Sequence, residues 1–181
     1  MTANRPAAER LSIGTAALAF FLLVGAARAE VALQGARWQR ADRINDKVSK
    51  GIDIVEASIL PGAALKGRML VKVRLLNRGP AKEGILLRYA VTAKIGPLAQ
   101  PQIEPAWALP YMLEEKRVPK IGANQFYEAT LDPTALTGLY LRKIYRMGYW
   151  PQELKVQVML EPRNGNAGAL QILEAVLPFR K

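Results

Sequence analysis

The 181-residue chain contains no cysteine and no histidine. Without cysteine it has neither disulfides nor thiolate metal ligands, so a folded domain depends on its apolar core for stability. Without histidine it lacks the commonest general base and the commonest protein ligand of zinc, copper and haem iron. We therefore expect no metal and no other cofactor, and the histidine-dependent catalytic triads are excluded.

Serine nucleophiles are scarce as well. After residue 29 the only serines are Ser49 and Ser58, and neither lies in the Gly-x-Ser-x-Gly turn of hydrolases. A mechanism that uses paired carboxylates stays open, because four glutamates have the chance to meet in the folded chain: Glu104, Glu114, Glu115 and Glu128. The alternative is that the run Glu114–Arg117 is a solvated strand face whose charges balance. We expect a protein that is not an enzyme.

The first 29 residues have the three parts of an export signal. Arg5 and Arg10 lie in a short polar start, the 15 residues 13–27 carry no charge, and Ala27 and Ala29 stand at the positions that signal peptidase requires. A membrane-spanning helix needs about 20 apolar residues, so this run is short for a span. We expect a signal helix that is cleaved after Ala29 and a periplasmic protein. The alternative is an uncleaved inner-membrane anchor, with the same domain facing the periplasm.

The chain is strongly basic. Its net charge is +11, and removal of the first 29 residues changes this only to +9. Basic clusters with neighbouring aromatic residues are typical of surfaces that bind anionic lipid headgroups or glycans, whereas exported proteins meet little nucleic acid. The alternative is that the charge serves solubility alone. The residues that we predict to bind anions are Arg37, Arg40, Arg43, Lys47 and Lys50 in one cluster and Arg142, Lys143 and Arg146 in another.

Beyond residue 51 apolar residues recur at every second position, which is typical of strands with one buried face. The clearest examples are residues 69–75 and 85–95. Between them lies NRGPAKEG (77–84), which predicts a loop, and we expect the two strands to pair as an antiparallel hairpin. Further strands are expected at residues 52–60, 111–118, 125–131, 153–161 and 169–177, the last two being joined through the turn signal Asn164-Gly165.

One helix is predicted, over DPTALTGLYLRKIYRMG (132–148). Asp132 is the expected N-cap, Pro133 stands at the first helical position and Gly148 ends the helix. We expect this helix to carry the chain from one sheet to another. Its expected buried stripe consists of Leu136, Leu139, Tyr140, Ile144 and Met147.

About seven short strands with regular turn signals predict a mainly β fold, an immunoglobulin-like antiparallel β-sandwich with one short crossover helix. The stretch VKVRLLNRGPAKEGILLRYAV (71–91) resembles the strand-loop-strand of bacterial immunoglobulin-like domains, in which Asn and Gly follow an alternating strand. The resemblance covers this stretch alone and implies a fold class and no function. We predict three parts: the signal segment 1–29, a basic polar lead-in over 30–51, and the sandwich domain 52–181.

Four prolines and a tryptophan mark GPLAQPQIEPAWALP (96–110), which predicts a stiff, extended surface loop. With the aromatic run MGYWP (147–151) it is the best place for a protein contact, because Trp and Tyr bury much area with few rotatable bonds. The alternative is that Trp107 and Trp150 plug the open ends of the sandwich. The residues that we predict to contact a partner are Trp107, Tyr111, Tyr149 and Trp150.

These patterns favour an exported binding protein, an accessory or assembly subunit of a bacterial envelope complex with a protein partner. A second hypothesis is an adaptor for an anionic envelope ligand, such as an acidic lipid or a phosphorylated glycan. High salt would abolish the binding of such a ligand but would affect an apolar protein interface much less. A third is an enzyme that depends on carboxylates or lysine, which requires two ionisable groups converging in one pocket.

Overall fold

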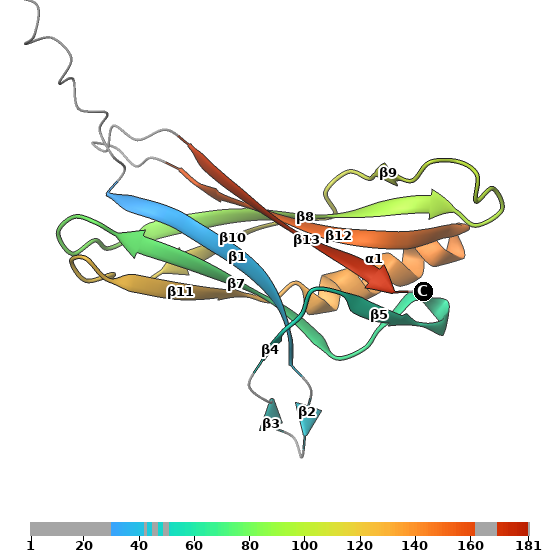
Figure 1. Ribbon diagram of the computed structural model, residues 1–181, viewed down its shortest axis with the longest axis horizontal. Helices are drawn as coiled ribbons and strands as arrows, with labels where there is room; N and C mark the ends of the chain where they lie inside the picture. Colours follow the sequence, from blue (N-terminus) through green and yellow to red (C-terminus); the bar gives the residue numbers. More distant parts are fainter. Residues whose placement is uncertain (1–29, 42, 45–46, 49–50, 162–169, 181) are drawn as a thin grey trace, which may run out of the picture.

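The computed structural model describes residues 30–41, 43–44, 47–48, 51–161 and 170–180. Within these residues the chain is mainly β, with one α-helix, α1 (Thr134–Arg146) (Figure 1). A four-stranded sheet has the order β11-β7-β1-β4, and a seven-stranded sheet has the order β10-β8-β12-β13-β5-β6, with β9 also paired to β8. β2 (Arg43–Ile44) and β3 (Lys47–Val48) form a separate small hairpin.

Each sheet gathers strands from several parts of the chain. The four-stranded sheet consists of β1 (Val31–Ala41), β4 (Ile52–Asp53), β7 (Arg68–Asn77) and β11 (Phe126–Leu131). The seven-stranded sheet consists of β5 (Ala57–Leu60), β6 (Ala64–Leu65), β8 (Ile85–Pro97), β9 (Ala106–Trp107), β10 (Met112–Val118), β12 (Tyr149–Leu160) and β13 (Gln171–Arg180), and a 3-10 turn, η1 (Pro61–Ala63), lies between β5 and β6.

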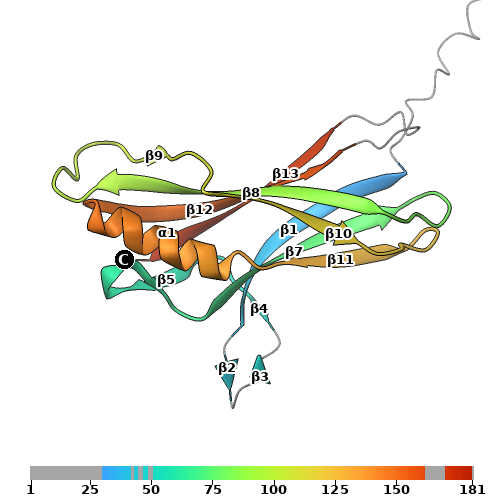
Figure 2. The same ribbon diagram turned by 180° about the vertical axis from the view of Figure 1, so that it is seen from behind.

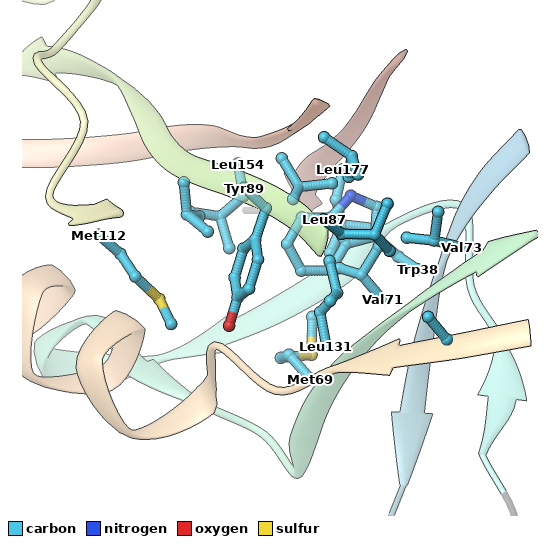
Figure 3. Close-up of a cluster of buried hydrophobic side chains, with 14 of the residues drawn as sticks. Trp38, Met69, Val71, Val73, Leu87, Tyr89, Met112, Leu131, Leu154 and Leu177 are labelled. Carbon is cyan, nitrogen blue, oxygen red and sulfur yellow. The ribbon is translucent and has the colours of Figure 1, made fainter. Parts of the chain in front are cut away.

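The seven-stranded sheet is covered on one face by two different layers. The four-stranded sheet lies over one end of the long strands β8 and β12, and α1 lies over the other end (Figures 1 and 2). Side chains from both sheets meet in one core, where Val71 of β7, Leu87 of β8 and Leu177 of β13 are fully buried (Figure 3). The alternation in β7 and β8 supplies this core because every second side chain points inward.

The segment 31–41, predicted to be part of a polar lead-in, is instead the strand β1, between β7 and β4 in the four-stranded sheet. Its indole, Trp38, is 2% exposed and belongs to the core. The strand was missed because its register shifts between Leu33 and Gly35, a bulge that interrupts the alternation of apolar residues.

The expected hairpin of residues 69–75 and 85–95 is wrong, because the two strands lie in different sheets. β7 pairs with β1 and β11, and β8 pairs with β10 and β12. The connection between them crosses from one sheet to the other and is tied by Asn77, a buried residue whose Nδ2 donates to the carbonyl oxygens of Pro80 (2.7 Å) and Gly122 (3.0 Å). The expected strand 52–60 is likewise divided, with β4 in one sheet and β5 in the other.

The helix lies where it was expected and does connect the two sheets, from β11 to β12. Its buried face differs from the expected stripe, since it consists of Thr137, Gly138, Leu141 and Ile144. Leu136, Leu139 and Met147 are exposed. Small side chains at 137 and 138 let the helix approach its neighbours closely, and this leaves a second apolar side of α1 open to solvent.

The mainly β prediction and the positions of most strands are confirmed. The expected signal segment 1–29 and the turn at Asn164-Gly165 lie outside the described residues, and the immunoglobulin-like topology stays a prediction. Among the described helices, none has the length and hydrophobicity needed to cross a membrane.

Candidate binding groove

The proline-rich loop and α1 flank the C-terminal end of β8 (Figure 2). Backbone hydrogen bonds hold the loop in place. β9 pairs with β8, with Trp107 opposite Lys94, and the Ala108 amide donates to the carbonyl oxygen of Ala93 (2.9 Å). At the start of the loop the Leu98 amide donates to the carbonyl oxygen of Gly148 (2.8 Å). Thr92 of β8 adds a side-chain bond, from Oγ1 to the carbonyl oxygen of Ala108 (2.7 Å). The loop is therefore a fixed wall.

A groove of about 710 Å³ lies between this wall and the helix. Such a volume is in the range of sites that hold a small molecule or a few side chains of a partner. Its lining is mostly apolar and aromatic, and comes from β8, the loop, α1 and the start of β12: Ile95, Pro97, Gln100, Ile103, Glu104, Ala106, Trp107, Ala108, Tyr140, Lys143, Ile144, Met147 and Tyr149.

A second hollow of about 440 Å³ lies on the other side of the loop. It shares Pro97 and Ile103 with the groove and is closed by Trp150 and Ile59. Gly96 also lines it, and a Cβ at that position would lie 3.3 Å from Pro105 Cγ, so the glycine lets the loop return close to β8. The groove and the hollow together form an apolar surface on both sides of one rigid loop.

Basic side chains border the groove along α1. Lys143 lines it, and Arg142 and Arg146 are exposed nearby on the helix. In the part of the chain that the structure describes, none of these three cations pairs with a carboxylate. The cation of Lys155 has a different role, since its Nζ lies 4.7 Å from the centre of the Trp107 ring and supports the indole from β12.

The structure brings together three of the four aromatic residues predicted to contact a partner. Trp107 and Tyr149 line the groove, and Trp150 lines the adjoining hollow. Tyr111 lies behind the groove, stacked on Tyr140 with ring centres 4.0 Å apart, and its hydroxyl is hydrogen-bonded to Thr137 (2.9 Å). Burial raises the pKa of Tyr111, so this residue is a neutral support of the helix.

The two clusters predicted to bind anions lie on different elements. Arg37 and Arg40 belong to β1, whereas Arg142, Lys143 and Arg146 belong to the C-terminal half of α1. Arg37 forms ion pairs with Asp53 (3.1 Å) and Glu128 (2.6 Å). The side chains of Arg43 and Lys47, and the whole of Lys50, lie outside the described residues.

The four glutamates considered for a carboxylate mechanism have separate surroundings. Glu114 accepts a hydrogen bond from the Tyr89 hydroxyl (2.6 Å), Glu115 pairs with Arg88 (2.9 Å), and Glu104 lines the groove. Burial, followed by the bond to Glu114, raises the pKa of Tyr89. Among the described residues no three Asp or Glu side chains gather as metal ligands would.

Sequence patterns did not reveal most of the groove lining. Ile95 of β8 and Tyr140 and Ile144 of α1 have the spacing of core residues, and spacing does not distinguish a core position from one that also lines a groove. Exposed apolar residues of the helix, such as Met147, were assigned to the core for the same reason. The available signals were the four prolines and one tryptophan of residues 96–110 and the aromatic run of residues 147–151.

No protein-family model matches the chain, and no curated protein matches it. Among solved structures, the C-terminal domain of wzt is similar with a TM-score of 0.41 and 6% sequence identity, over 86% of this chain and 76% of that one. A protein from Archaeoglobus fulgidus is similar with a TM-score of 0.30 and 8% identity, over 83% of this chain and 99% of that one.

Proposed function

We propose that the protein is an exported accessory or assembly subunit of a bacterial envelope complex and that it binds a partner protein in the groove between the proline-rich loop and α1. The observation that carries this proposal is the pairing of a rigid aromatic wall, Trp107 and Tyr149, with an apolar helix side that the core does not use. Aromatic side chains in a preformed groove are typical binding hot spots.

The proposed occupant is an extended segment of a partner protein with apolar side chains next to acidic ones. The apolar part is argued from the exposed Leu136, Leu139 and Met147, which continue the lining along α1. The acidic part is argued from Lys143 and Arg146, cations that have no carboxylate partner in the described part of the chain. Opposite charges at the border of a contact favour the correct partner and its rate of association.

The wall also suits a segment of backbone. In the β9 ladder Ala108 donates to Ala93, so the neighbouring residue Trp107 turns its amide and carbonyl away from β8. A strand of a partner has hydrogen-bonding groups available there. Further along the same edge of the sheet, β10 carries four charged residues in its centre, Glu114–Arg117, and such charges disfavour strand addition.

A photo-crosslinking amino acid tests the groove in the intact envelope. It is placed at Leu109, which is 87% exposed and directly follows the groove-lining Ala108, and at Val55, which is also 87% exposed but has no sequence neighbour in the groove lining. We expect one discrete crosslinked protein from position 109, lost when Trp107 is changed to Ala, and none from position 55. Equal crosslinking from both positions would contradict the proposal.

Export is tested separately by fractionation and by mass spectrometry of the purified protein's N-terminus. We expect a periplasmic protein that begins at Glu30, because Ala27 and Ala29 suit signal peptidase. A chain that begins at Met1 and is found in the membrane fraction would contradict cleavage and support the anchored alternative, in which the groove still faces the periplasm.

A second candidate function is an adaptor for an anionic envelope ligand, favoured by Arg142, Lys143 and Arg146, which have no carboxylate partner among the residues that the structure describes. The two candidates differ in salt dependence. Binding to an anionic lipid vesicle weakens steeply between low and high salt, whereas contact with an apolar segment persists.

A further inference from the structure

A hollow of about 400 Å³ lies on the outer face of the four-stranded sheet, which does not contribute to the groove. Its lining is Gln34, Gly35, Ala36, Arg37, Lys72, Arg74 and Phe126. The bulge in β1 adjoins it, and bulges are found beside binding sites because they redirect the chain. A Cβ at Gly35 would meet nothing within 4 Å, so the missing side chain leaves this space open.

Two of its three cations are neutralised within the protein. Arg37 pairs with Asp53 (3.1 Å) and Glu128 (2.6 Å), and Lys72 pairs with the same Glu128 (3.5 Å). These two cations and two carboxylates therefore balance. Arg74 has no carboxylate partner in the described part of the chain, and it gives the cluster a single net positive charge.

An aromatic ring holds Arg74 in position. Its Cζ lies 3.9 Å above the centre of the Phe126 ring, which is itself 54% exposed. Stacking restricts the guanidinium without using its N–H groups, and these groups form a planar fork that matches two carboxylate oxygens. The arginine is fixed beside an open space and retains its donors.

We propose that this hollow binds the carboxylate of a small polar monoanion, with Arg74 as the bidentate donor. The single excess charge suits a monoanion, the volume suits a ligand of monosaccharide size, and Gln34 supplies an amide for a further polar contact. Such a carboxylate belongs either to an acidic sugar or to the end of a peptide. The site is independent of the proposed groove, since the two have no lining residue in common.

The test uses D-glucuronate and N-acetylglycine as probes for the two sources and D-glucose as the uncharged control, each titrated into the mature protein and followed by NMR. We expect at least one of the two carboxylates to shift the amide signals of residues 34–37 and 72–74, and glucose to have no effect. The carboxylate that binds more tightly shows whether the site takes an acidic sugar or the end of a peptide. No shift with either carboxylate would overturn the proposal, as would tighter binding of inorganic phosphate.

Two variants separate the site from general charge. Arg74→Gln removes the charged donor and is expected to weaken binding roughly tenfold or more. Gly35→Leu places a side chain in the hollow and is expected to abolish binding, and its Cβ has space because no atom lies within 4 Å of that position. Arg117→Gln, an exposed and unpaired arginine on β10 among the described residues, is the control and leaves binding unchanged. Binding that survives both Arg74→Gln and Gly35→Leu would refute the site, whatever becomes of the groove.

Discussion

The indole Nε1 of Trp38 donates a hydrogen bond of 3.1 Å to the carbonyl oxygen of Ala175, which joins β1 of one sheet to β13 of the other. Gln171 adds two further bonds at the same seam: its Oε1 accepts from the Leu33 amide (2.9 Å), and its Nε2 donates to the Val31 carbonyl oxygen (2.9 Å). Side chains thus satisfy backbone groups along an edge where no ladder forms, and they lock the two layers together.

Removal of the Trp38 bond is expected to destabilise the fold. Trp38→Phe leaves the Ala175 carbonyl oxygen without this donor and opens space in the core, so we expect a loss of about 1–3 kcal/mol in the free energy of unfolding. Equilibrium unfolding in urea measures it. Trp107→Phe is the matched control, because Trp107 is 39% exposed and should cost less. Equal losses for the two variants would contradict a special role for the seam.

Asn77 is expected to be the most sensitive polar residue of the core. Its Nδ2 donates to the carbonyl oxygens of Pro80 and Gly122, and its Oδ1 accepts from the Gly79 amide (3.1 Å), so one side chain fixes two of the connections that cross between the sheets, from β7 to β8 and from β10 to β11. Asn77→Ala leaves these backbone groups without their hydrogen-bond partner, and we expect a loss of about 2–3 kcal/mol in the free energy of unfolding. Urea unfolding checks this, and a loss near zero would show that solvent replaces the side chain.

Acid is expected to weaken the link between β7 and the start of α1. Burial raises the pKa of Asp132, but hydrogen bonds from Arg68 and Thr134 outweigh it and bring that pKa below its usual value. A lowered folded-state pKa gives stability that is present above the unfolded-state pKa, about 3.9, and is lost as the pH falls through the folded value. The pair is partly exposed, so its contribution is expected to be below about 1 kcal/mol.

The comparison of Asp132→Asn with the unchanged protein measures this contribution. We expect the variant to be less stable at pH 7 and the difference to shrink at pH 3, which is below the unfolded-state pKa of about 3.9, because the Asp132 carboxyl of the unfolded chain then binds a proton more readily than that of the folded protein. A difference that is the same at both pH values would assign the effect to packing instead of charge.

Sequence periodicity revealed the strands but not their neighbours. Residues such as Val71 and Leu87 alternate because each strand buries one face, and this depends only on the local chain. Which strand lies beside β7 depends on the loop at Asn77, whose contacts with Gly122 join residues far apart in sequence. The bulge in β1 hid a central strand for a related reason, since one extra residue reverses the alternation.

The groove was predictable only in part. Trp107 and Trp150 stood out by composition, and the structure places them on the two sides of the proline-rich loop. The helix contribution was not predictable, because α1 has apolar residues on more than one side and the core uses the side with Thr137 and Gly138. Helical spacing alone cannot decide between two such sides.

Charge reversal on α1 is expected to separate recognition from general attraction. Lys143→Glu with Arg146→Glu places two negative charges beside the groove, and we expect them to repel the acidic part of the proposed partner segment, so that crosslinking from position 109 is lost. Lys116→Glu with Arg117→Glu changes the net charge by the same amount on β10, at two exposed residues that also lack a carboxylate partner in the described part of the chain. We expect this second variant to retain the crosslink.

Equal loss of the crosslink in both variants would show that net charge alone attracts the partner. Retention of the crosslink in both variants would show that apolar contacts with Trp107 and Met147 hold the segment, and it would refute the acidic part of the proposed partner segment.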